Sequence, residues 1–555
     1  MIILQVSNIF FEITLIVILA SFFSIVFRFL KQPPILAYIL TGIIIGPFGN
    51  LQLQSGEFLR TLGALGVAFL LFMIGLELKF SDLKSVGRVS LITGISQIVF
   101  TSVIGYFISL VLGFSQIASL YIAIALTFSS TIIIVKLLSD KKDLQSLYGK
   151  IAVGFLLVQD FFAVLLLIFL SSFSQGAASV EGVLISAAKG VLLFAAVLFL
   201  SKNIFPRIID KIATSAETLF LFSIAWVLGL SALVASPPLG FSIEIGGFLA
   251  GLALANSSEN FEIMGRVKSL RDFFITIFFV LLGMSMSFVS ISNIFFPILI
   301  FSAFILIGNP LIVMIIMGLM GFRKRTSFLA GLTVAQISEF SLIVVFLGQK
   351  VGHLSNEVVS LVTAVGVITF AVSTYMILNG DKLYKILSPM LGIFERRKTT
   401  ENIGNLDVVK DHVVLIGVNR MGRSVLDALL EHKQDVLVVD FNPDVINNLR
   451  SGKNLPAGRQ VKNLFGDISD LEIQERANLA GAKLVISTVA DINDNMSLIS
   501  EVKKIKNGPK IIAVANNNRE EEELKKAGAN YVIQPHVLSG KHIAHLIKTD
   551  SLFRN

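Results

Sequence analysis

Long apolar runs separated by short polar connections fill the chain up to about residue 392. Thirteen of these runs approach the roughly 17–25 residues that a helix needs to cross a bilayer. They lie at 8–29, 34–48, 59–77, 89–112, 116–139, 150–172, 180–201, 215–235, 239–256, 270–287, 293–320, 326–349 and 356–379. No small-residue cleavage site follows the first run, so we interpret it as a membrane helix and not as a signal peptide.

The amino-acid composition favours a membrane protein as well. The 555 residues are 54% hydrophobic and 15% charged, with a mean hydropathy of +0.80. Such values are typical of a chain with many membrane helices. The absence of cysteine from the sequence excludes disulfides, thiolate metal sites and thiol redox chemistry. The six histidines show no metal-binding spacing, and we expect no transition metal.

The pattern changes after the segment GIFERRKTTENIGNLD, where short apolar strands begin to alternate with helical stretches. We therefore divide the chain into a membrane domain (1–392), a linker (393–407) and a soluble α/β tail (408–555). Acidic and basic residues nearly balance in the tail, so the formal net charge of +8 comes mainly from the membrane domain. Basic loops explain that charge better than a nucleic-acid surface does, and we expect no nucleic-acid partner.

Basic residues gather in the connections that follow odd-numbered runs. Arg28 and Lys31 follow the first run, Lys141 and Lys150 follow the fifth, and the other odd connections are similar; Lys350 is the exception after an even-numbered run. Since basic loops remain in the cytoplasm, the N-terminus is expected outside and the tail inside. We expect a multi-pass protein of a prokaryotic inner membrane.

The membrane domain repeats itself in three places at similar offsets. The paired segments are PPILAYILTGIIIGP with PPLGFSIEIGGFLAGLALA, LLFMIGLELKFS with FVLLGMSMSFVS, and ALTFSSTIIIVKLL with GLTVAQISEFSLIV. Runs 1–6 thus correspond to runs 8–13. An offset of seven runs reverses the orientation in the membrane, and inverted repeats with interrupted helices are typical of secondary transporters.

Two apolar runs at matching positions of the repeat, runs 5 and 12, are interrupted by polar residues. Run 5 contains Thr127, Ser129 and Ser130, and run 12 contains Gln336 and Glu339. In transporters of this kind such helices unwind near the midplane, so that half-helix ends and freed carbonyls face the ion. The alternative is that the Ser and Thr hydroxyls only bond back to carbonyls of their own helix.

Run 6 carries a carboxylate in the middle of the apolar segment GFLLVQDFFAVLLL. A charge at this depth costs several kcal/mol unless it meets a partner or water, so Asp160 is a candidate functional residue. A carboxyl group in apolar surroundings holds its proton more tightly than in water. A proton and a cation could then compete for it. The structural alternative is an Asp that pairs with a buried Lys or caps a broken helix.

Six segments of the membrane domain together resemble the monovalent cation:proton antiporter superfamily, and most of all its potassium-efflux branch with a cytoplasmic nucleotide-binding tail. They are QPPILAYILTGIIIGP, LLFMIGLEL, TFSSTIIIVKLL, GFLLVQDFFAV, GGFLAGLALANS and AQISEFSLIV. The resemblance implies a homodimer with a scaffold and a moving core that bears the ion site. It assigns Asp160 as the carrier of cation and proton, and Gln159 as a neutral oxygen ligand.

Asn309 in run 11 occupies the position where the electrogenic branch of this superfamily has a lysine. One carboxylate without a counter-lysine predicts one proton exchanged for one cation, which is electroneutral. Asn309 could contact the ion, or it could satisfy the helix hydrogen bond that Pro310 removes. The expected fold is thus a polytopic α-helical membrane protein with an inverted repeat and two broken crossing helices, followed by an α/β Rossmann-like domain.

The tail begins with a strand, a glycine turn, a helix and a second strand, in HVVLIGVNRMGRSVLDALLEHKQDVLVVDF. Gly417 and Gly422 take the first and third glycine positions of a G-x-G-x-x-G turn, and Asn419, which tolerates a left-handed backbone, replaces the second. Asp440 ends the second strand, where an acidic residue binds ribose hydroxyls. The segments NLFGDISD, AKLVISTVADINDNM, KIIAVANNN and YVIQP predict four further strands, and residues 451–461 an insertion.

This tail resembles the regulator-of-potassium-conductance nucleotide-binding domain. The resemblance and the turn together assign the candidate ligand-binding residues Gly417, Asn419, Arg420, Met421, Gly422, Asp440, Asp467 and Asn495. We expect an adenine nucleotide, NAD(H), AMP or ATP, as a regulatory ligand, because the helix N-terminus favours phosphate. A domain that has kept the shape and lost the ligand is the alternative.

These observations predict a K⁺ or Na⁺/proton antiporter that works by alternating access and is gated by nucleotide binding to the tail. A nucleotide-gated cation channel is the alternative. The inverted repeat, the lone Asp160 and the absence of a carbonyl selectivity filter from the sequence argue against the channel. A membrane-tethered oxidoreductase ranks third, because no dehydrogenase-like set of catalytic residues accompanies the nucleotide fold, and we expect no enzyme.

Overall fold

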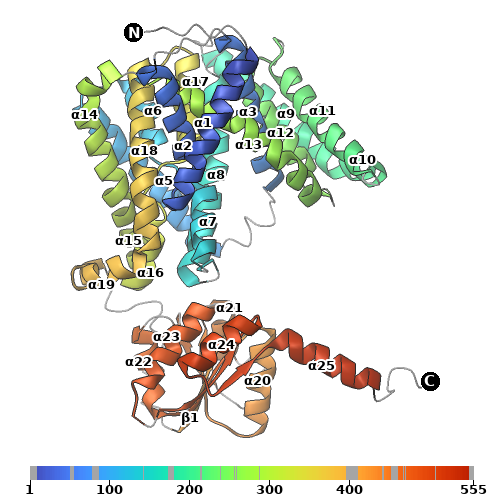
Figure 1. Cartoon of the computed structure of the whole chain (residues 1–555), viewed down its shortest axis with the longest axis vertical. Helices are drawn as coiled ribbons and strands as arrows, with labels where there is room; N and C mark the ends of the chain where they lie inside the picture. The colour runs from blue at the N-terminus through green and yellow to red at the C-terminus, as the bar shows by residue number, and fades with distance from the viewer. Residues whose placement is uncertain are drawn as a thin grey trace. The chain divides into compact units, whose positions relative to one another are not determined.

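The computed structural model describes residues 9–548 except 50–54, 78–86, 142, 145, 173–179, 213–214, 238, 256, 258, 287, 395–410, 441–442, 452–460, 467, 469–470, 490 and 507. The chain divides into two compact units, a helical one within residues 1–385 and a second one that contains the tail from residue 386 onward (Figure 1). Most of the proposed linker and of the proposed insertion lies outside the described residues.

Every predicted apolar run contains a helix or a broken helix. The helices are α1 Ile9–Phe29, α2 Pro34–Ile43 with the π-turn η1 Ile44–Phe48, α3 Gly56–Glu77, α5 Gly87–Val111, α6 Gln116–Ala125, α7 Thr131–Asp140, α8 Leu147–Ser172, α9 Val180–Asn203, α11 Ala216–Val234, α12 Ile243–Leu254, α13 Asn260–Met284, α14 Phe288–Ala303 with the π-turn η3 Phe304–Gly308 and α15 Asn309–Leu319, α16 Lys324–Leu332, α17 Glu339–Lys350 and α18 Asn356–Leu378. Two shorter helices, α10 Phe205–Ile212 and α19 Gly380–Leu391, were not predicted.

Seven helical stretches within the described residues are long and apolar enough to cross a membrane by themselves. Several others are short, among them the halves of the broken helices. The polytopic helical fold is therefore confirmed, whereas thirteen crossings remain a prediction.

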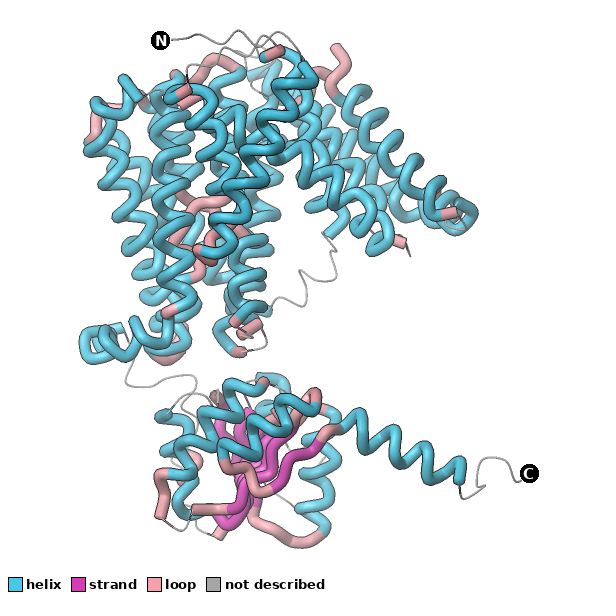
Figure 2. The backbone as a smooth tube through the Cα atoms, viewed as in Figure 1, coloured by secondary structure: helices cyan, strands magenta, loops and turns pink. Residues whose placement is uncertain are grey.

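Both broken helices appear where the polar interruptions predicted them. Residues 126–130 separate α6 from α7, and residues 333–338 separate α16 from α17, so loop segments lie inside the helical unit (Figure 2). Ser338 caps α17, because its hydroxyl accepts the Phe340 N–H at 3.2 Å. The polar residues thus end one half-helix and start the next instead of lining a continuous helix.

Glycines bring α3 and α2 into close contact with α12 and α13. A Cβ on Gly251 would lie 2.0 Å from the carbonyl oxygen of Phe72, and one on Gly42 would lie 1.9 Å from that of Val280. Only a residue without a side chain permits such approach, as at helix interfaces within membranes. These helices are tightly packed. Because lipid tails are as apolar as the side chains, van der Waals contact between the helices drives their association in place of the hydrophobic effect.

The tail contains a parallel six-stranded sheet in the order β3-β2-β1-β4-β5-β6. Its strands are β1 His412–Ile416, β2 Val436–Asp440, β3 Lys462–Phe465, β4 Ala482–Ser487, β5 Lys510–Val514 and β6 Tyr531–Ile533. Its helices are α20 Arg420–Glu431, α21 Pro443–Arg450, α22 Leu471–Arg476, α23 Ile492–Lys503, α24 Asn518–Ala527 and α25 Pro535–Lys548. The order reverses between β1 and β4, where doubly wound sheets bind ligands. The predicted strands are confirmed.

Candidate functional site

Gln159 and Asp160 are adjacent in α8, and Gln159 contacts the first helix break. Gln159 is fully buried and Asp160 is 9% exposed. The Gln159 side-chain oxygen accepts the Ser129 backbone N–H at 3.1 Å. Since Ser129 belongs to the break between α6 and α7, this hydrogen bond joins α8 to the unwound backbone one residue before the buried carboxylate.

A second glutamine, which the sequence analysis missed, completes this contact from α5. The Gln159 amide donates to the Gln97 side-chain oxygen at 2.7 Å. The Gln97 amide in turn donates to the Thr127 carbonyl at 3.1 Å and to the Thr101 hydroxyl at 3.1 Å. The freed carbonyl of the break is thus satisfied by a side chain, which the interior of a membrane requires.

The sequence did contain a signal for Gln97 and Thr101. The buried residues of α5 are all small or polar: Ser90, Thr93, Gly94, Gln97, Thr101, Gly105 and Ser109. They recur every three or four residues, which is one face of a helix. Large apolar residues such as Val99 and Phe100 are exposed instead. A helix with this inverted pattern turns its polar face inward, where it can hold the breaks in neighbouring helices.

Asn309 joins both breaks. Its amide donates to the Leu126 carbonyl at 3.3 Å and, more weakly, to the Val334 carbonyl at 3.5 Å, while its side-chain oxygen accepts the Thr101 hydroxyl at 2.9 Å. The idea that Asn309 compensates for the helix bond lost at Pro310 is therefore wrong. Its amide reaches the carbonyls at the ends of α6 and α16, because these are the acceptors that unwinding leaves open.

The hydroxyl groups of the first break differ in their bonding. The Thr127 hydroxyl bonds back to the Ala123 carbonyl at 2.8 Å and lies 2.8 Å from the Ser102 hydroxyl. For Thr127 the structure thus agrees with the alternative interpretation of helix back-bonding. Within the described residues, the Ser129 hydroxyl is buried without a hydrogen-bond partner. That oxygen remains able to bind a cation.

Glu339 connects the second break to the first. The carboxylate is 3% exposed, accepts the Ser338 hydroxyl at 3.4 Å and has the Ser130 hydroxyl as a further hydrogen-bond partner. Arg271 of α13 provides a positive charge that acts on Glu339. The Arg271 guanidinium also lies 2.7 Å from Asp272. Glu339 is consequently a buried carboxylate that interacts with hydroxyl groups of both breaks, and the charge of Arg271 is a weaker influence on it.

Gln336 lies in the second break and bonds to α18. Its side-chain oxygen accepts the Ser373 hydroxyl at 2.7 Å. Its amide nitrogen is buried and has no hydrogen-bond partner among the described residues. The hydrogen bond to Ser373 thus joins the second break to α18.

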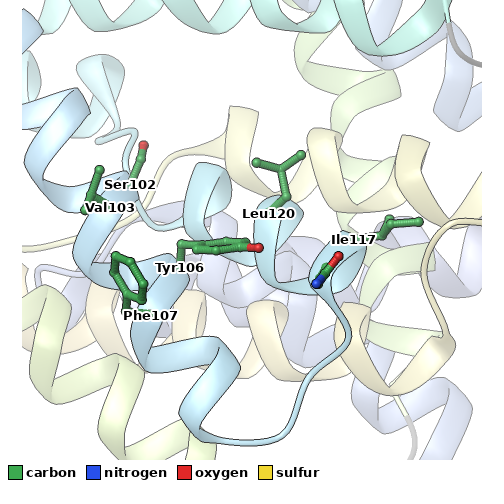
Figure 3. A pocket seen from close by; sticks show the side chains of 7 residues that line it. Ser102, Val103, Tyr106, Phe107, Ile117 and Leu120 are labelled. Carbon is green, nitrogen blue, oxygen red and sulfur yellow. The ribbon is translucent and has the colours of Figure 1, made fainter.

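A groove of about 590 Å³ lies between α5 and α6, beside the first break (Figure 3). Its lining is apolar apart from Ser102, Tyr106 and Gln116. No acidic side chain lines it, so we assign no cation to this groove. Among the described residues, no group of three or more His, Cys, Asp and Glu side chains could hold a metal ion.

In the tail, the glycine turn lies between β1 and α20. Gly417 has φ of +80°, and a Cβ on Gly422 would lie 2.0 Å from the Gly417 carbonyl oxygen, so both positions require glycine. The left-handed backbone expected at Asn419 is wrong. Its φ is −71°, and its side chain caps α20 by accepting the Gly422 N–H at 2.9 Å. Asparagine replaces the second glycine because a helix N-cap needs a side-chain acceptor.

Asp440 lies at the carboxyl end of β2, beside this turn. Its carboxylate accepts the Val418 N–H at 2.7 Å and so holds the backbone of the turn. Arg420 is exposed and Met421 half-buried in the first turn of α20. The first-turn N–H groups of a helix point outward, so phosphate fits this turn.

Two further candidate ligand-binding residues of the tail are Asp467 and Asn495. Asp467 lies outside the described residues. Asn495 is buried, and its amide donates to the carbonyls of Val489 at 3.0 Å and Val514 at 3.2 Å. It therefore joins the ends of β4 and β5, and only its side-chain oxygen is without a partner in the described part of the chain.

Comparison with protein families identifies both units. Residues 15–378 match the sodium/hydrogen exchanger family in its transmembrane part, and residues 413–535 match the TrkA-N domain. Because the first match covers more than half of the chain, the chain belongs to the sodium/hydrogen exchanger family. It is a multi-pass membrane protein of the cation/proton antiporter class, with a Rossmann-like tail.

Two relatives illustrate how far the similarity extends. YbaL of Escherichia coli (strain K12), assigned by its name to cation/proton antiport, is 26% identical over 543 residues, which are 96% of each chain. K(+) efflux antiporter 1, chloroplastic, of Arabidopsis thaliana is 26% identical over 513 residues, which are 90% of this chain but 42% of that protein.

A solved structure shares the fold of the membrane unit. The sodium proton antiporter MjNhaP1 from Methanocaldococcus jannaschii matches with a TM-score of 0.50 at 19% identity, over 69% of this chain and 97% of that one. At this identity the likeness shows the fold alone.

Proposed function

We propose that the chain exchanges a monovalent cation, K⁺ or Na⁺, for a proton by competition at Asp160. The observation that supports the proposal is the hydrogen bond between Gln159 and the backbone of Ser129 in the first break, because Asp160 is the next residue of the same helix. A group that can be protonated or bind a cation, but not both at once, couples their opposite movements. Alternating access of the site to the two sides then moves one ligand each way.

The oxygen ligands of the cation are proposed to come from the first break. The Ser129 hydroxyl is buried without a partner in the described part of the chain, so a bound cation would satisfy it. Gln159 and Asn309 are assigned another role. The Gln159 amide donates to the Gln97 side-chain oxygen at 2.7 Å, and the Asn309 amide donates to the Leu126 carbonyl at 3.3 Å. We therefore propose that these two residues position the helix breaks.

The proposed exchange is electroneutral, because a single carboxylate is proposed to carry both ligands. Among the described residues Glu12, Asp160, Glu244 and Glu339 are buried carboxylates, and Asp160 is the proposed carrier. If the other buried groups keep their charge throughout the cycle, only the change in charge at Asp160 has to be balanced. Either one proton or one monovalent cation does so. Glu339 is then an electrostatic partner of the site and does not carry a proton.

Purified protein in proteoliposomes tests this proposal. An imposed pH gradient should drive cation uptake against the cation gradient, followed with a pH-sensitive dye across K⁺, Na⁺, Rb⁺ and Li⁺. A nucleotide-gated channel would carry cations only down their own gradient. Clamping the membrane potential with valinomycin in Na⁺ assays should leave the rate unchanged. A strong dependence on voltage would show that a second charge moves.

For the tail we propose an adenine nucleotide, NAD(H), AMP or ATP, as a regulatory ligand. The support is the positive φ of Gly417, the outward N–H groups of α20 and the carboxylate of Asp440 beside the turn. The charge of Asp440 would disfavour a ribose 2′-phosphate, so NADP(H) should bind poorly. Regulation requires that the nucleotide bind differently in two transport states.

Calorimetry on the full chain in detergent measures nucleotide binding, and exchange with and without the nucleotide measures gating. Binding without any change in exchange would contradict gating. We further propose a homodimer in a prokaryotic inner membrane, with the N-terminus outside and the tail in the cytoplasm. Helix α25 exposes Val537, Leu538, Ile543 and Ile547, an apolar surface that a second copy could cover.

A further inference from the structure

Two basic residues lie at the ends of helices where the sequence is otherwise almost free of them. Arg60 lies in the first turns of α3, and Lys350 is the last residue of α17. The connections after even-numbered apolar runs contain no other Lys or Arg, as the segments 49–58, 113–115, 173–179, 236–238, 288–292 and 351–355 show. Basic residues of a membrane protein usually mark its cytoplasmic connections, and these two residues lie outside that pattern. These two residues therefore need another explanation.

Both residues line the same cavity of about 980 Å³. η1, α3, α13, α17 and the start of α18 enclose it. On one wall Phe278 of α13 meets Phe346 of α17 edge to face, with ring centroids 5.6 Å apart. The whole cavity belongs to the helical unit of the chain.

The cavity is polar on one part of its lining and apolar on the rest. Arg60, Lys350, Gln349, Asn356 and Ser285 supply polar groups, and the Gln349 amide donates to the Asn356 side-chain oxygen. The remaining side chains are apolar: Leu59, Ala64, Phe278, Leu281, Leu282, Met284 and Phe346. A ligand that fills such a space carries both a polar and an apolar part.

No acidic side chain lines this cavity beside Arg60 and Lys350 in the described part of the chain. Within the described residues, Arg60 and Lys350 form no salt bridge, and both are exposed. Two uncompensated positive charges around one cavity attract an anion and repel a metal cation. The negative part of the ligand thus belongs beside Arg60 and Lys350.

We propose that this cavity binds an anionic phospholipid. Its phosphate lies between Arg60 and Lys350, and its acyl chains lie against the apolar side chains of α3, α13 and α17. A lipid fits better than a free anion because most of the lining is apolar, and the unit crosses the membrane that supplies it. The site is separate from the Asp160 site, and the inference does not depend on the transport proposal.

Lipid binding to the full chain in mild detergent tests the proposal directly. Phosphatidylglycerol, phosphatidylcholine with the same acyl chains, glycerol phosphate and inorganic phosphate are titrated separately. Native mass spectrometry counts retained lipid, and the melting temperature reports binding. We expect phosphatidylglycerol alone to be retained and to raise the melting temperature. Glycerol phosphate or inorganic phosphate binding as tightly as phosphatidylglycerol would overturn the lipid assignment, as would equal binding of phosphatidylcholine.

Charge-neutralising variants locate the site. Arg60→Gln and Lys350→Gln should each weaken phosphatidylglycerol binding about fivefold, from about 1 kcal/mol per basic residue near anionic lipid. Arg60→Lys should retain it. The matched control is Lys268→Gln, which removes an exposed charge of α13 outside the cavity. Unchanged binding in both single variants, or an equal loss in the control, would overturn the proposal. Because each variant is compared with its own melting curve without lipid, a destabilised variant still gives a result.

Discussion

Two candidate sites of the molecule use helix ends. One is the group of polar contacts around the two helix breaks, which we call the crossing, and the other is the glycine turn of the tail. The residues that form the two sites are separated by very different distances along the chain. In the tail, the Val418 N–H and the Asp440 carboxylate are 22 residues apart. In the membrane unit, Thr101 and Asn309, which share a hydrogen bond, are 208 residues apart. The turn is thus formed by one continuous segment, whereas the crossing requires four helices that are distant in sequence.

The two sites also differ in their access to water. Asn419 and Arg420 are exposed, so water can replace a lost hydrogen bond at the turn. Gln97, Gln159 and Asn309 are fully buried, so a group that loses its partner there remains unsatisfied. An unsatisfied buried polar group costs about 1–3 kcal/mol. Loss of a side chain should therefore have a larger effect at the crossing than at the turn.

The largest effect is expected for Asp160→Asn, which should abolish exchange in proteoliposomes while the protein still folds. Asparagine cannot take up a proton or balance a cation, so neither half of the cycle remains. Dye-monitored exchange measures the loss, and size-exclusion chromatography measures folding. Glu217→Gln, which neutralises an exposed carboxylate of α11, is the control and should exchange like the original chain. Exchange by folded Asp160→Asn would refute the carrier assignment.

Asn309→Ala should lower both stability and exchange. It leaves the Leu126 and Val334 carbonyls and the Thr101 hydroxyl without their partner, so we expect a loss of about 1–3 kcal/mol in unfolding free energy. Thermal melting in detergent checks this. Asn379→Ala is the control, since that amide is exposed at the end of α18. Equal melting temperatures for the two variants would mean that the buried hydrogen bonds of Asn309 do not support the crossing.

Asp440→Ala should weaken adenine-nucleotide binding about tenfold and leave exchange without nucleotide unchanged. The expected loss of binding free energy is about 1.5 kcal/mol, which is at the lower end of the range for a hydrogen bond to a charged group. Calorimetry on the full chain provides the affinity. Glu431→Ala, at an exposed position at the end of α20, is the control. If nucleotide binding were the same in Asp440→Ala and the control, the ribose would bind elsewhere.

The smallest effect is expected for Asn419→Ala, which removes the N-cap of α20. Loss of an N-cap costs about 1 kcal/mol, and water can partly compensate at this exposed position. The melting temperature should fall slightly, less than in Asn309→Ala. Ser424→Ala on the exposed face of α20 serves as the reference. A larger fall in melting temperature for Asn419→Ala than for Asn309→Ala would show that losing a side chain costs more stability at the turn than at the crossing.

Local sequence patterns predicted the outline of both units. The strands of the tail consist of consecutive apolar residues, and the turn at Gly417 and Gly422 lies between two of them, so local pattern was sufficient. The breaks at 126–130 and 333–338 were predictable because polar residues interrupt otherwise apolar runs. Asp160 was recognisable because a carboxylate in such a run is costly.

Which polar groups meet could be read only from the folded molecule. The sequence around Asn309 does not predict its partners, and the structure shows that its amide donates to the carbonyls of Leu126 and Val334, one from each break. Asn419 caps a helix and is not left-handed, because its backbone angle is set by the start of α20. Hydrogen bonds act over about 3 Å, while the chain brings distant residues together only by folding. Local pattern therefore predicts elements, and packing decides their partners.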